Sequence, residues 1–295
     1  MMNERFNRNE GFFGREGQER IAASRIAIIG VGGLGTHVVQ QLALLGVGHL
    51  TLVDDEELDA TNRNRYIGAK YDDPIPGTPK VNIGERIIHS IDPGIQVDKV
   101  FDSLVSEDAF AAVITADHVF GCLDNEGARL LLTELCAAYS RPYFDIASDI
   151  PPDDLLAYGG RICVAWDGNG CLVCLDVLDV AEAQADLLDP DARRNRDAIY
   201  GVNRELLGGS GPTVVSINGV VASLAVTEFM VAVTGIRSPQ KVLNYYGHRA
   251  IVTVSKNDPA PDCYYCKGLR GMGDAADVQR YIRNGAGASL RRKPE

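Results

Sequence analysis

Two pairs of cysteines carry the clearest chemistry in the sequence. Cys171 and Cys174 form one CxxC pair, and Cys263 and Cys266 form a second pair much later in the chain. Each pair can hold two corners of a tetrahedral metal ion, so together they predict a structural Zn²⁺ that ties distant segments together. A CxxC redox pair is disfavoured because neither pair follows a thioredoxin-like strand at the start of a helix.

A glycine-rich turn predicts a nucleotide site. It follows a short β-branched run, Arg25–Ile29, and precedes apolar residues at helical spacing. Glycines let a backbone approach phosphates, and the helix supplies N–H groups and the positive end of its dipole. Asp54, at the end of the next strand, is placed to accept hydrogen bonds from a ribose diol, which disfavours glycines kept only for packing. The glycines are Gly30, Gly32, Gly33 and Gly35.

Cations follow this acid in an order that favours a triphosphate. Arg65 closes a Thr-Asn-Arg-Asn-Arg run after the second strand, and Lys80 stands at the start of a later helix. Arginine matches phosphate oxygens in bidentate fashion, and lysine acts as a point charge. A dinucleotide dehydrogenase has no use for so many cations here, although each one alone could be a solvated surface residue.

A further acidic group follows a strand that ends at Phe120. Asp124 lies just beyond it, where the carboxyl ends of strands bind ligands in open α/β sheets, and Asn125 begins the next helix. Asp124 is therefore a candidate Mg²⁺ ligand or phosphate-site acid. The alternative is that Asp124 only caps the helix.

Alternating strand and helix patterns predict an α/β fold with a Rossmann-like, doubly wound, mostly parallel sheet. Two late strands, over 242–246 and 250–254, are expected to pair in antiparallel fashion. The other expected strands cover 25–29, 49–53, 96–101, 118–120, 142–146 and 160–166, and the expected helices cover 81–90, 106–115 and 125–140.

The chain is expected to form one domain over residues 1–283, with an N-terminal arm over 1–24 and a loose basic tail over 284–295. Residues 176–210 lack a sustained apolar period and are expected to form a long irregular crossover. The apolar run over 213–235 contains polar residues and a glutamate, which favours a buried helix over a membrane span.

Composition excludes several classes of protein. Twenty-nine Lys and Arg against 40 Asp and Glu leave a net charge of −11, which disfavours nucleic acid as the main partner. The N-terminus lacks the apolar stretch of a secretory signal, so we expect a cytoplasmic protein with no membrane partner. Seven cysteines are an odd number and too few for a disulfide framework, so the thiols outside the two pairs, Cys122, Cys136 and Cys163, are expected to be buried.

These motifs, in this order, resemble the ThiF/MoeB superfamily of adenylating enzymes, which includes ubiquitin-activating enzymes and sulfur-carrier adenylyltransferases. By this resemblance, the glycine turn is the nucleotide loop and Asp54 the ribose acid. Asn62 and Arg65 match the family's Asn-x-x-Arg phosphate pair, and Lys80 matches its catalytic lysine. Asp124 and Asn125 match its Asp-Asn pair, in which the aspartate positions Mg²⁺, and the four cysteines match its structural zinc.

The resemblance implies a homodimer and an ATP-dependent adenylyltransferase. Arg8 matches an arm residue that reaches the ATP phosphates of the partner subunit. The implied reaction is attack by a carboxylate on the α-phosphate of ATP, with pyrophosphate as the leaving group. Arg8, Arg65, Lys80 and Mg²⁺ at Asp124 would offset the charge that develops. The carboxylate in this family is usually the C-terminal glycine of a ubiquitin-like or sulfur-carrier protein.

The sequence departs from thioester-forming relatives because residues 176–210 contain no cysteine. Two possibilities remain, namely adenylation with a separate downstream acceptor or conjugating partner, and transfer to a hydroxyl. Ser210 is a speculative nucleophile before the apolar helix, although a flexible turn that caps this helix explains it more simply. Alternative functions are adenylation of a small molecule, a peptide or a tRNA base, and a nucleotide-binding scaffold without catalysis.

Overall fold

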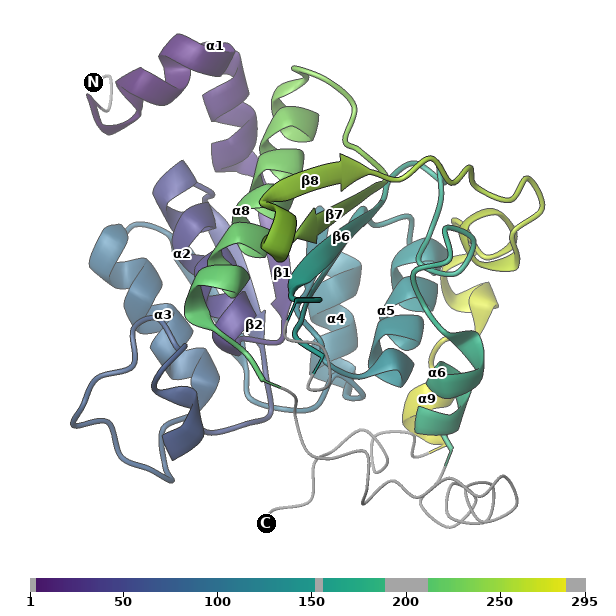
Figure 1. The fold of residues 1–295 in the computed structure, drawn as a ribbon, viewed down its shortest axis with the longest axis horizontal. Helices are drawn as coiled ribbons and strands as arrows, with labels where there is room; N and C mark the ends of the chain where they lie inside the picture. Colours follow the sequence, from purple (N-terminus) through teal and green to yellow (C-terminus); the bar gives the residue numbers. More distant parts are fainter. Residues whose placement is uncertain (1–3, 152–155, 189–211, 285–295) are drawn as a thin grey trace.

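One eight-stranded sheet organises the protein (Figure 1). The computed structural model describes residues 4–151, 156–188 and 212–284. The strand order is β3-β2-β1-β4-β5-β6-β7-β8. The first five of these strands are parallel to one another, and β6, β7 and β8 continue the sheet in antiparallel fashion. This arrangement confirms the predicted fold class, including the antiparallel pair near the C-terminus.

The strands are β1 (Arg25–Ile29), β2 (His49–Val53), β3 (Gln96–Val100), β4 (His118–Gly121), β5 (Tyr143–Asp149), β6 (Gly159–Ala165), β7 (Val242–Tyr246) and β8 (Ile251–Val254). The longer helices are α1 (Asn7–Ala23), α2 (Gly33–Leu45), α3 (Lys80–Ile91), α4 (Glu107–Thr115), α5 (Glu126–Ala138) and α8 (Val215–Thr234). Shorter helices are α6 (Val180–Asp186), α9 (Arg280–Arg283) and the single turns η1 (Glu4–Phe6), η2 (Ala60–Asn62), η4 (Gly247–Arg249), η5 (Tyr264–Gly268) and η6 (Gly273–Ala276).

Local sequence explains why the first βαβ unit forms where it does. The β-branched residues of β1 are buried on both faces of the sheet, as expected of a central parallel strand. Helix α2 ends at Gly46, whose φ of 91° is left-handed and favours glycine. The chain then turns directly into β2, which pairs with β1 so that Ile29 lies opposite Val53.

Helices cover both faces of the sheet (Figure 1). Helices α2, α3 and α8 lie on one face, with α1 packed on α8, and α4 and α5 lie on the other. Each face has its own apolar core, one containing Phe144 and Phe229 and the other Phe110 and Tyr143.

Helix α8 is the core helix that the sequence predicted. Its length and apolar composition would suffice to cross a membrane, and among the described helices it alone passes that test. It packs against α1, α2, β5 and β6, and its polar side chains Asn218 and Glu228 are buried within the fold. This packing buries 44% of the membrane-length window of α8 inside the fold.

The expectation of an irregular crossover is wrong for part of the segment. Residues 180–186 form α6, which is capped by Asp179 and packs on α5. Ala183 and Ala185 are buried there, and a Cβ on Gly127 of α5 would meet the Cβ of Asp186 at 2.7 Å. Small side chains and a glycine thus allow close helix packing in a segment too short and acidic to show an apolar period. Residues 189–210 of the predicted crossover, including Ser210, lie outside the described residues.

Candidate active site and candidate metal centre

A cavity of about 860 Å³ lies at the carboxyl ends of the parallel strands. The register aligns Ile29 of β1 with Val53 of β2 and Gly121 of β4, so the loops that follow these strands meet at one edge. The strand order reverses between β1 and β4, which is where open α/β sheets bind ligands. The predicted nucleotide residues that line the cavity are Gly30, Gly32, Gly33, Asp54, Asn62, Arg65, Lys80, Asp124 and Asn125.

The glycine turn is shaped by two close backbone approaches. Gly30 has a φ of 89°, and a Cβ there would lie 2.6 Å from the carbonyl oxygen of Cys122. A Cβ on Gly35 would lie 2.1 Å from the carbonyl oxygen of Gly30. Gly35 therefore brings α2 close to β1 and does not line the cavity, whereas Gly32 and Gly33 do. Of the four predicted glycines, Gly30, Gly32 and Gly33 line the cavity, and Gly35 serves the packing of α2 on β1.

Asp54 fixes the loops that follow β1 and β2. Its carboxylate accepts hydrogen bonds from the backbone N–H of Val31 at 2.7 Å and of Glu56 at 2.9 Å. Burial raises the pKa of Asp54 to about 6, although the positive charge of Lys80 and these two N–H groups oppose the shift. A carboxylate oxygen can accept more than one hydrogen bond, so the group retains capacity for a ribose hydroxyl.

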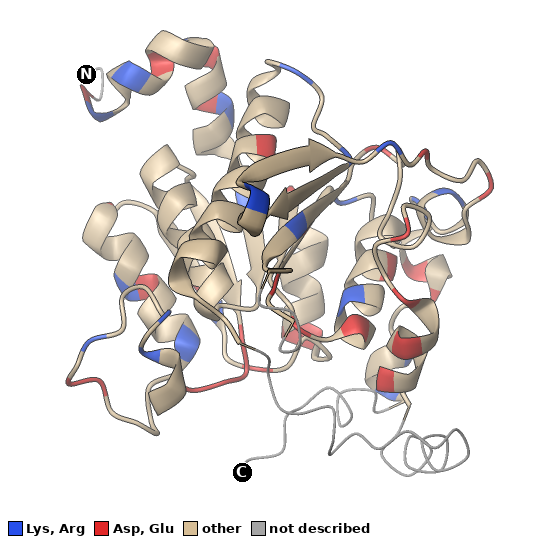
Figure 2. Ribbon diagram, viewed as in Figure 1, with Lys and Arg blue, Asp and Glu red and all other residues tan. Residues whose placement is uncertain are grey.

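The predicted phosphate cations lie on the same side of the cavity as Asp54. Figure 2 shows the acidic run from Asp54 to Glu57 in the connection that leaves β2. Lys80 is buried, and its ammonium pairs with Glu56, a residue that the sequence analysis did not single out. Arg65 donates to the carbonyl oxygen of Thr61 at 2.6 Å. Any triphosphate bound here would meet a lysine that already has a carboxylate partner.

The two residues of the Asp-Asn pair have different positions in the structure, one at the helix cap and one in the cavity wall. Asn125 is the N-cap of α5, and its side-chain oxygen accepts from the N–H of Ala128 at 2.9 Å. Asp124 is exposed in the cavity wall and does not cap the helix. The alternative in which Asp124 serves as the cap is therefore wrong, and its carboxylate remains suited to the predicted Mg²⁺ role.

A buried ionic cluster behind the Asp-Asn pair was missed by the sequence analysis. Arg129, one turn into α5, donates through Nε to Asp145 at 2.9 Å and forms a second, shorter bond to the same carboxylate. It also donates to Glu126 at 2.6 Å, and Tyr143 donates to Asp145 at 2.9 Å. Arg161 of β6 approaches Glu126 at 3.9 Å. A charged residue inside the apolar helix α5 was the only local signal for this cluster.

Two predicted catalytic residues are not brought to this cavity in the described chain. Arg8 is exposed on α1 and does not line it. Ser210 lies outside the described residues. The roles of both remain predictions.

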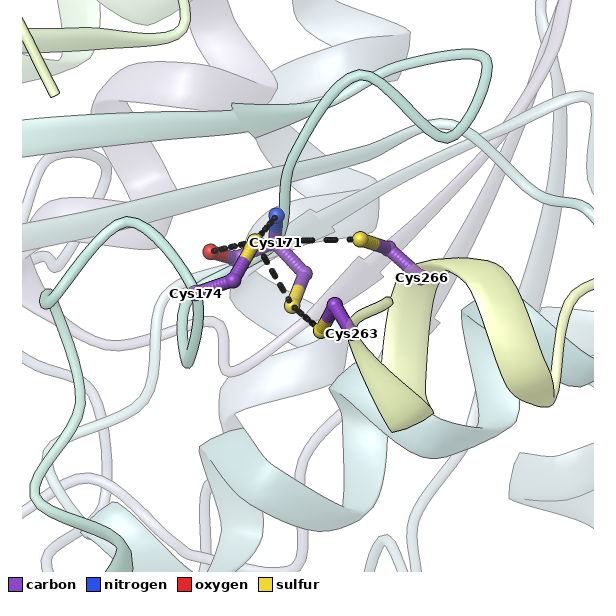
Figure 3. A group of neighbouring side chains, drawn as sticks. All are labelled: Cys171, Cys174, Cys263 and Cys266. Carbon is purple, nitrogen blue, oxygen red and sulfur yellow. Dashed lines mark hydrogen bonds between the residues drawn. The ribbon is translucent and has the colours of Figure 1, made fainter. Parts of the chain in front are cut away.

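The four paired cysteines converge as predicted (Figure 3). Cys171 and Cys174 come from the segment after β6, and Cys263 and Cys266 come from the start of η5 after β8. The Sγ atoms of Cys171 and Cys263 are 3.7 Å apart, those of Cys174 and Cys266 3.7 Å, and those of Cys171 and Cys174 3.8 Å.

This geometry fits tetrahedral zinc. A Zn–S distance of about 2.3 Å in a regular tetrahedron places sulfur atoms about 3.8 Å apart. Burial raises the pKa of the Cys171 thiol above its ordinary range and that of Cys266 to about 12. A bound divalent cation would reverse this by stabilising the thiolates. Of the thiols outside the cluster, Cys136 and Cys163 are buried as expected, whereas the expectation is wrong for Cys122, which is half-buried in the cavity wall.

Solved structures with the same fold include MccB from Escherichia coli in complex with AMPCPP and MccA. The TM-score is 0.69 at 18% sequence identity, over 90% of this chain and 74% of the MccB chain. At this identity the likeness concerns the fold.

Similar sequences include the sulfur carrier protein ThiS adenylyltransferase of Escherichia coli, which is 28% identical over 78% of this chain and 80% of its own length. The vegetative HesA protein of Trichormus variabilis is 33% identical over 46% of this chain. That match spans about half of the HesA protein, 51% of its length. The ThiF family model matches residues 6–264, nearly the whole described chain. The predicted resemblance is thus confirmed, and the chain belongs to the ThiF family.

Proposed function

We propose that this protein adenylates the C-terminal carboxylate of a ubiquitin-like or sulfur-carrier protein with ATP. The observation that carries the proposal is one cavity lined by a ribose acid, Asp54, by the phosphate cations Arg65 and Lys80, and by an exposed acid, Asp124. These are the groups that nucleotidyl transfer needs, and they come from separate loops that only the fold brings together.

The reaction proceeds by attack of a carboxylate oxygen on the α-phosphorus of ATP. The new bond joins this oxygen to phosphorus, and the bond from phosphorus to the bridging oxygen of the β-phosphate breaks. Pyrophosphate leaves with the electron pair, so no proton transfer is required. Arg65 and Lys80 offset the charge on the phosphates, and Asp124 would hold a Mg²⁺ ion that would stabilise the charge developing on them.

The proposal includes a homodimer, in which Arg8 of each subunit completes the phosphate site of the other. It also includes zinc in the cysteine cluster, ATP and Mg²⁺ as cofactors, and a cytoplasmic location. The acyl group then passes to a downstream partner, or to a hydroxyl such as that of Ser210.

The test is carboxylate-dependent exchange of labelled pyrophosphate into ATP. Purified ubiquitin-fold proteins that end in glycine are offered one at a time, and the matched control lacks the terminal glycine. Exchange with the intact protein and none with the truncated one supports the proposal. Absence of exchange with every carboxylate offered would contradict it.

A second candidate is adenylation of a short peptide. The MccB structures favour it, because their fold is the same and one of them contains both a nucleotide analogue and MccA. Exchange that depends on a free peptide, and not on a folded carrier protein, would select this candidate.

A further inference from the structure

The cavity extends well beyond the predicted nucleotide residues. Its far end is lined by β5 and β6, including Ala147, Ser148 and Arg161. None of these residues belongs to the nucleotide motifs. Because the nucleotide motifs account for the β2 side of the cavity, the far end is the space left for the second substrate.

Sheet order places Arg161 away from the phosphate cations. Asp54 follows β2, Asp124 follows β4, and Arg161 lies on β6. Since neighbouring strands are about 4.8 Å apart, β6 lies about 10 Å beyond β4 and about 19 Å beyond β2. Arg65 and Lys80 come from the connection after β2 and from α3. Arg161 is therefore poorly placed for the outer phosphates and well placed for a group that approaches Asp124 from the opposite side.

The guanidinium of Arg161 is held in the wall with its hydrogen-bonding capacity unused. Its side chain is 32% exposed, and its Nε is buried without a partner. Within the part of the chain that the structure describes, it donates no hydrogen bond, and its nearest carboxylate, Glu126, is 3.9 Å away. The same Glu126 oxygen already accepts from Arg129 at 2.6 Å.

The surroundings of Arg161 disfavour its charge. Burial and the neighbouring positive charge of Arg129 lower the pKa of Arg161. The carboxylates of Asp145 and Glu126 oppose this shift, but both already accept hydrogen bonds from Arg129, so neither is a dedicated partner for Arg161. A partly desolvated cation that lacks a full partner is costly to maintain unless a ligand supplies the missing charge.

We propose that Arg161 binds the carboxylate of the acyl substrate and orients it toward the α-phosphate of ATP. This inference rests on the proposed adenylation. The guanidinium donates to one carboxylate oxygen while the other attacks phosphorus. In the product, the bound oxygen is the carbonyl oxygen of the acyl-adenylate, so the contact persists through the reaction. Every peptide or protein tail that ends in a carboxylate carries an oxygen that Arg161 can bind in this way.

The experiment measures binding by calorimetry with two probes, AMP and adenosine sulfamate acylated with glycylglycine. The second probe mimics an acyl-adenylate and carries the carbonyl oxygen in question. The variants are R161Q, R161K and R141Q. Arg141 is a matched control because its Nε is also buried without a partner, but it lies beside the cysteine cluster and not in this cavity.

We expect R161Q to bind the acylated probe about 10-fold to 100-fold more weakly than the wild type, the usual effect of losing a charged hydrogen bond. Binding of AMP should be unchanged, R161K should lose less affinity than R161Q, and R141Q should match the wild type. The proposal is overturned if R161Q keeps wild-type affinity for the acylated probe. It is also overturned if the affinity of R161Q for AMP falls by the same factor as its affinity for the acylated probe.

The two proposals fail in different ways. A wild type that binds AMP but gains no affinity from the acyl group contradicts acyl adenylation itself. If the wild type binds the acylated probe more tightly than AMP and R161Q binds it equally tightly, only the role of Arg161 is contradicted.

Discussion

Nucleotide binding should weaken in acid because an ionised Asp54 accepts stronger hydrogen bonds from a ribose than a protonated Asp54 does. Burial raises the pKa of Asp54 from 3.8 to about 6, against the opposing effects of Lys80 and two backbone N–H groups. The carboxylate is therefore ionised at pH 8 and mostly protonated at pH 5. One pH unit below the pKa, about one tenth of a carboxyl group is ionised. If only the ionised form binds ribose, the dissociation constant should rise about 10-fold between pH 8 and pH 5.

The assay is calorimetric binding of AMPCPP across this range, with D54N as the control. Phosphate groups also titrate with a pKa of about 6, so the informative quantity is the ratio of wild-type to D54N affinity. D54N should bind more weakly at pH 8, and its remaining pH dependence should be that of the ligand.

The sign of the stability effect provides a second check. Because the folded-state pKa lies above the ordinary value, the native state binds this proton more tightly than the unfolded chain. The free energy of unfolding of the wild type should fall relative to D54N as pH rises from 3.8 to about 6. A ratio of affinities that stays constant from pH 8 to pH 5 would refute the assignment of Asp54 to the ribose.

Three other substitutions test separate parts of the molecule. K80M should slow pyrophosphate exchange about 100-fold or more, since a preorganised cation is removed from the phosphate site; a loss of threefold or less, about 0.7 kcal/mol, would exclude that role. D145N removes the fully buried charge partner of Arg129, which keeps only its ion pair with the half-buried Glu126. It should lower the free energy of unfolding by about 3–5 kcal/mol in urea titrations, whereas a loss below about 1 kcal/mol would contradict the importance of this pair. C174S removes one of four thiols and should abolish a stoichiometric zinc signal in metal analysis and lower the melting temperature; equal zinc content in variant and wild type would argue against a site built from all four cysteines.

The residues on the β2 side of the cavity could be predicted because their signals are local. The glycine turn, Asp54 and Lys80 each follow or begin an element whose pattern is clear in the sequence, and the strands over 25–29 and 49–53 were predicted to the residue. The rule that ligands bind at the carboxyl ends of parallel strands then places the loops together without knowledge of the packing.

The acyl side was not predictable because its contacts depend on register between distant elements. Asp145 receives Arg129 from α5, and Arg161 reaches Glu126 only because β6 pairs with β5 in antiparallel fashion. In the sequence, Arg161 is one arginine in a glycine-rich stretch with no motif around it. Helix α6 was not predicted for a related reason. Close contact with α5 holds it in place, and its sequence lacks a helical pattern of apolar residues.

The change of strand direction at β6 joins the two sides of the site and links them to the metal centre. Because β6 is antiparallel to β5, its beginning lies at the edge where the parallel strands end, which brings Arg161 to the cavity. The chain leaves β6 toward Cys171 and Cys174, and the other two ligands follow β8. A bound zinc would therefore restrain β6 and β8 together at the end of the strands away from the cavity.

This connection predicts an asymmetric effect of metal loss. Removing the metal from the intact protein, or replacing Cys174 by serine, should weaken binding of the acylated sulfamate more than binding of AMP. The reason is that the nucleotide residues follow β1, β2 and β4, which the cluster does not join, whereas Arg161 lies on β6. Equal loss of both ligands would mean that the metal stabilises the whole sheet as one unit. No loss of either would mean that β6 is held in place by its pairing with β5 and β7 alone.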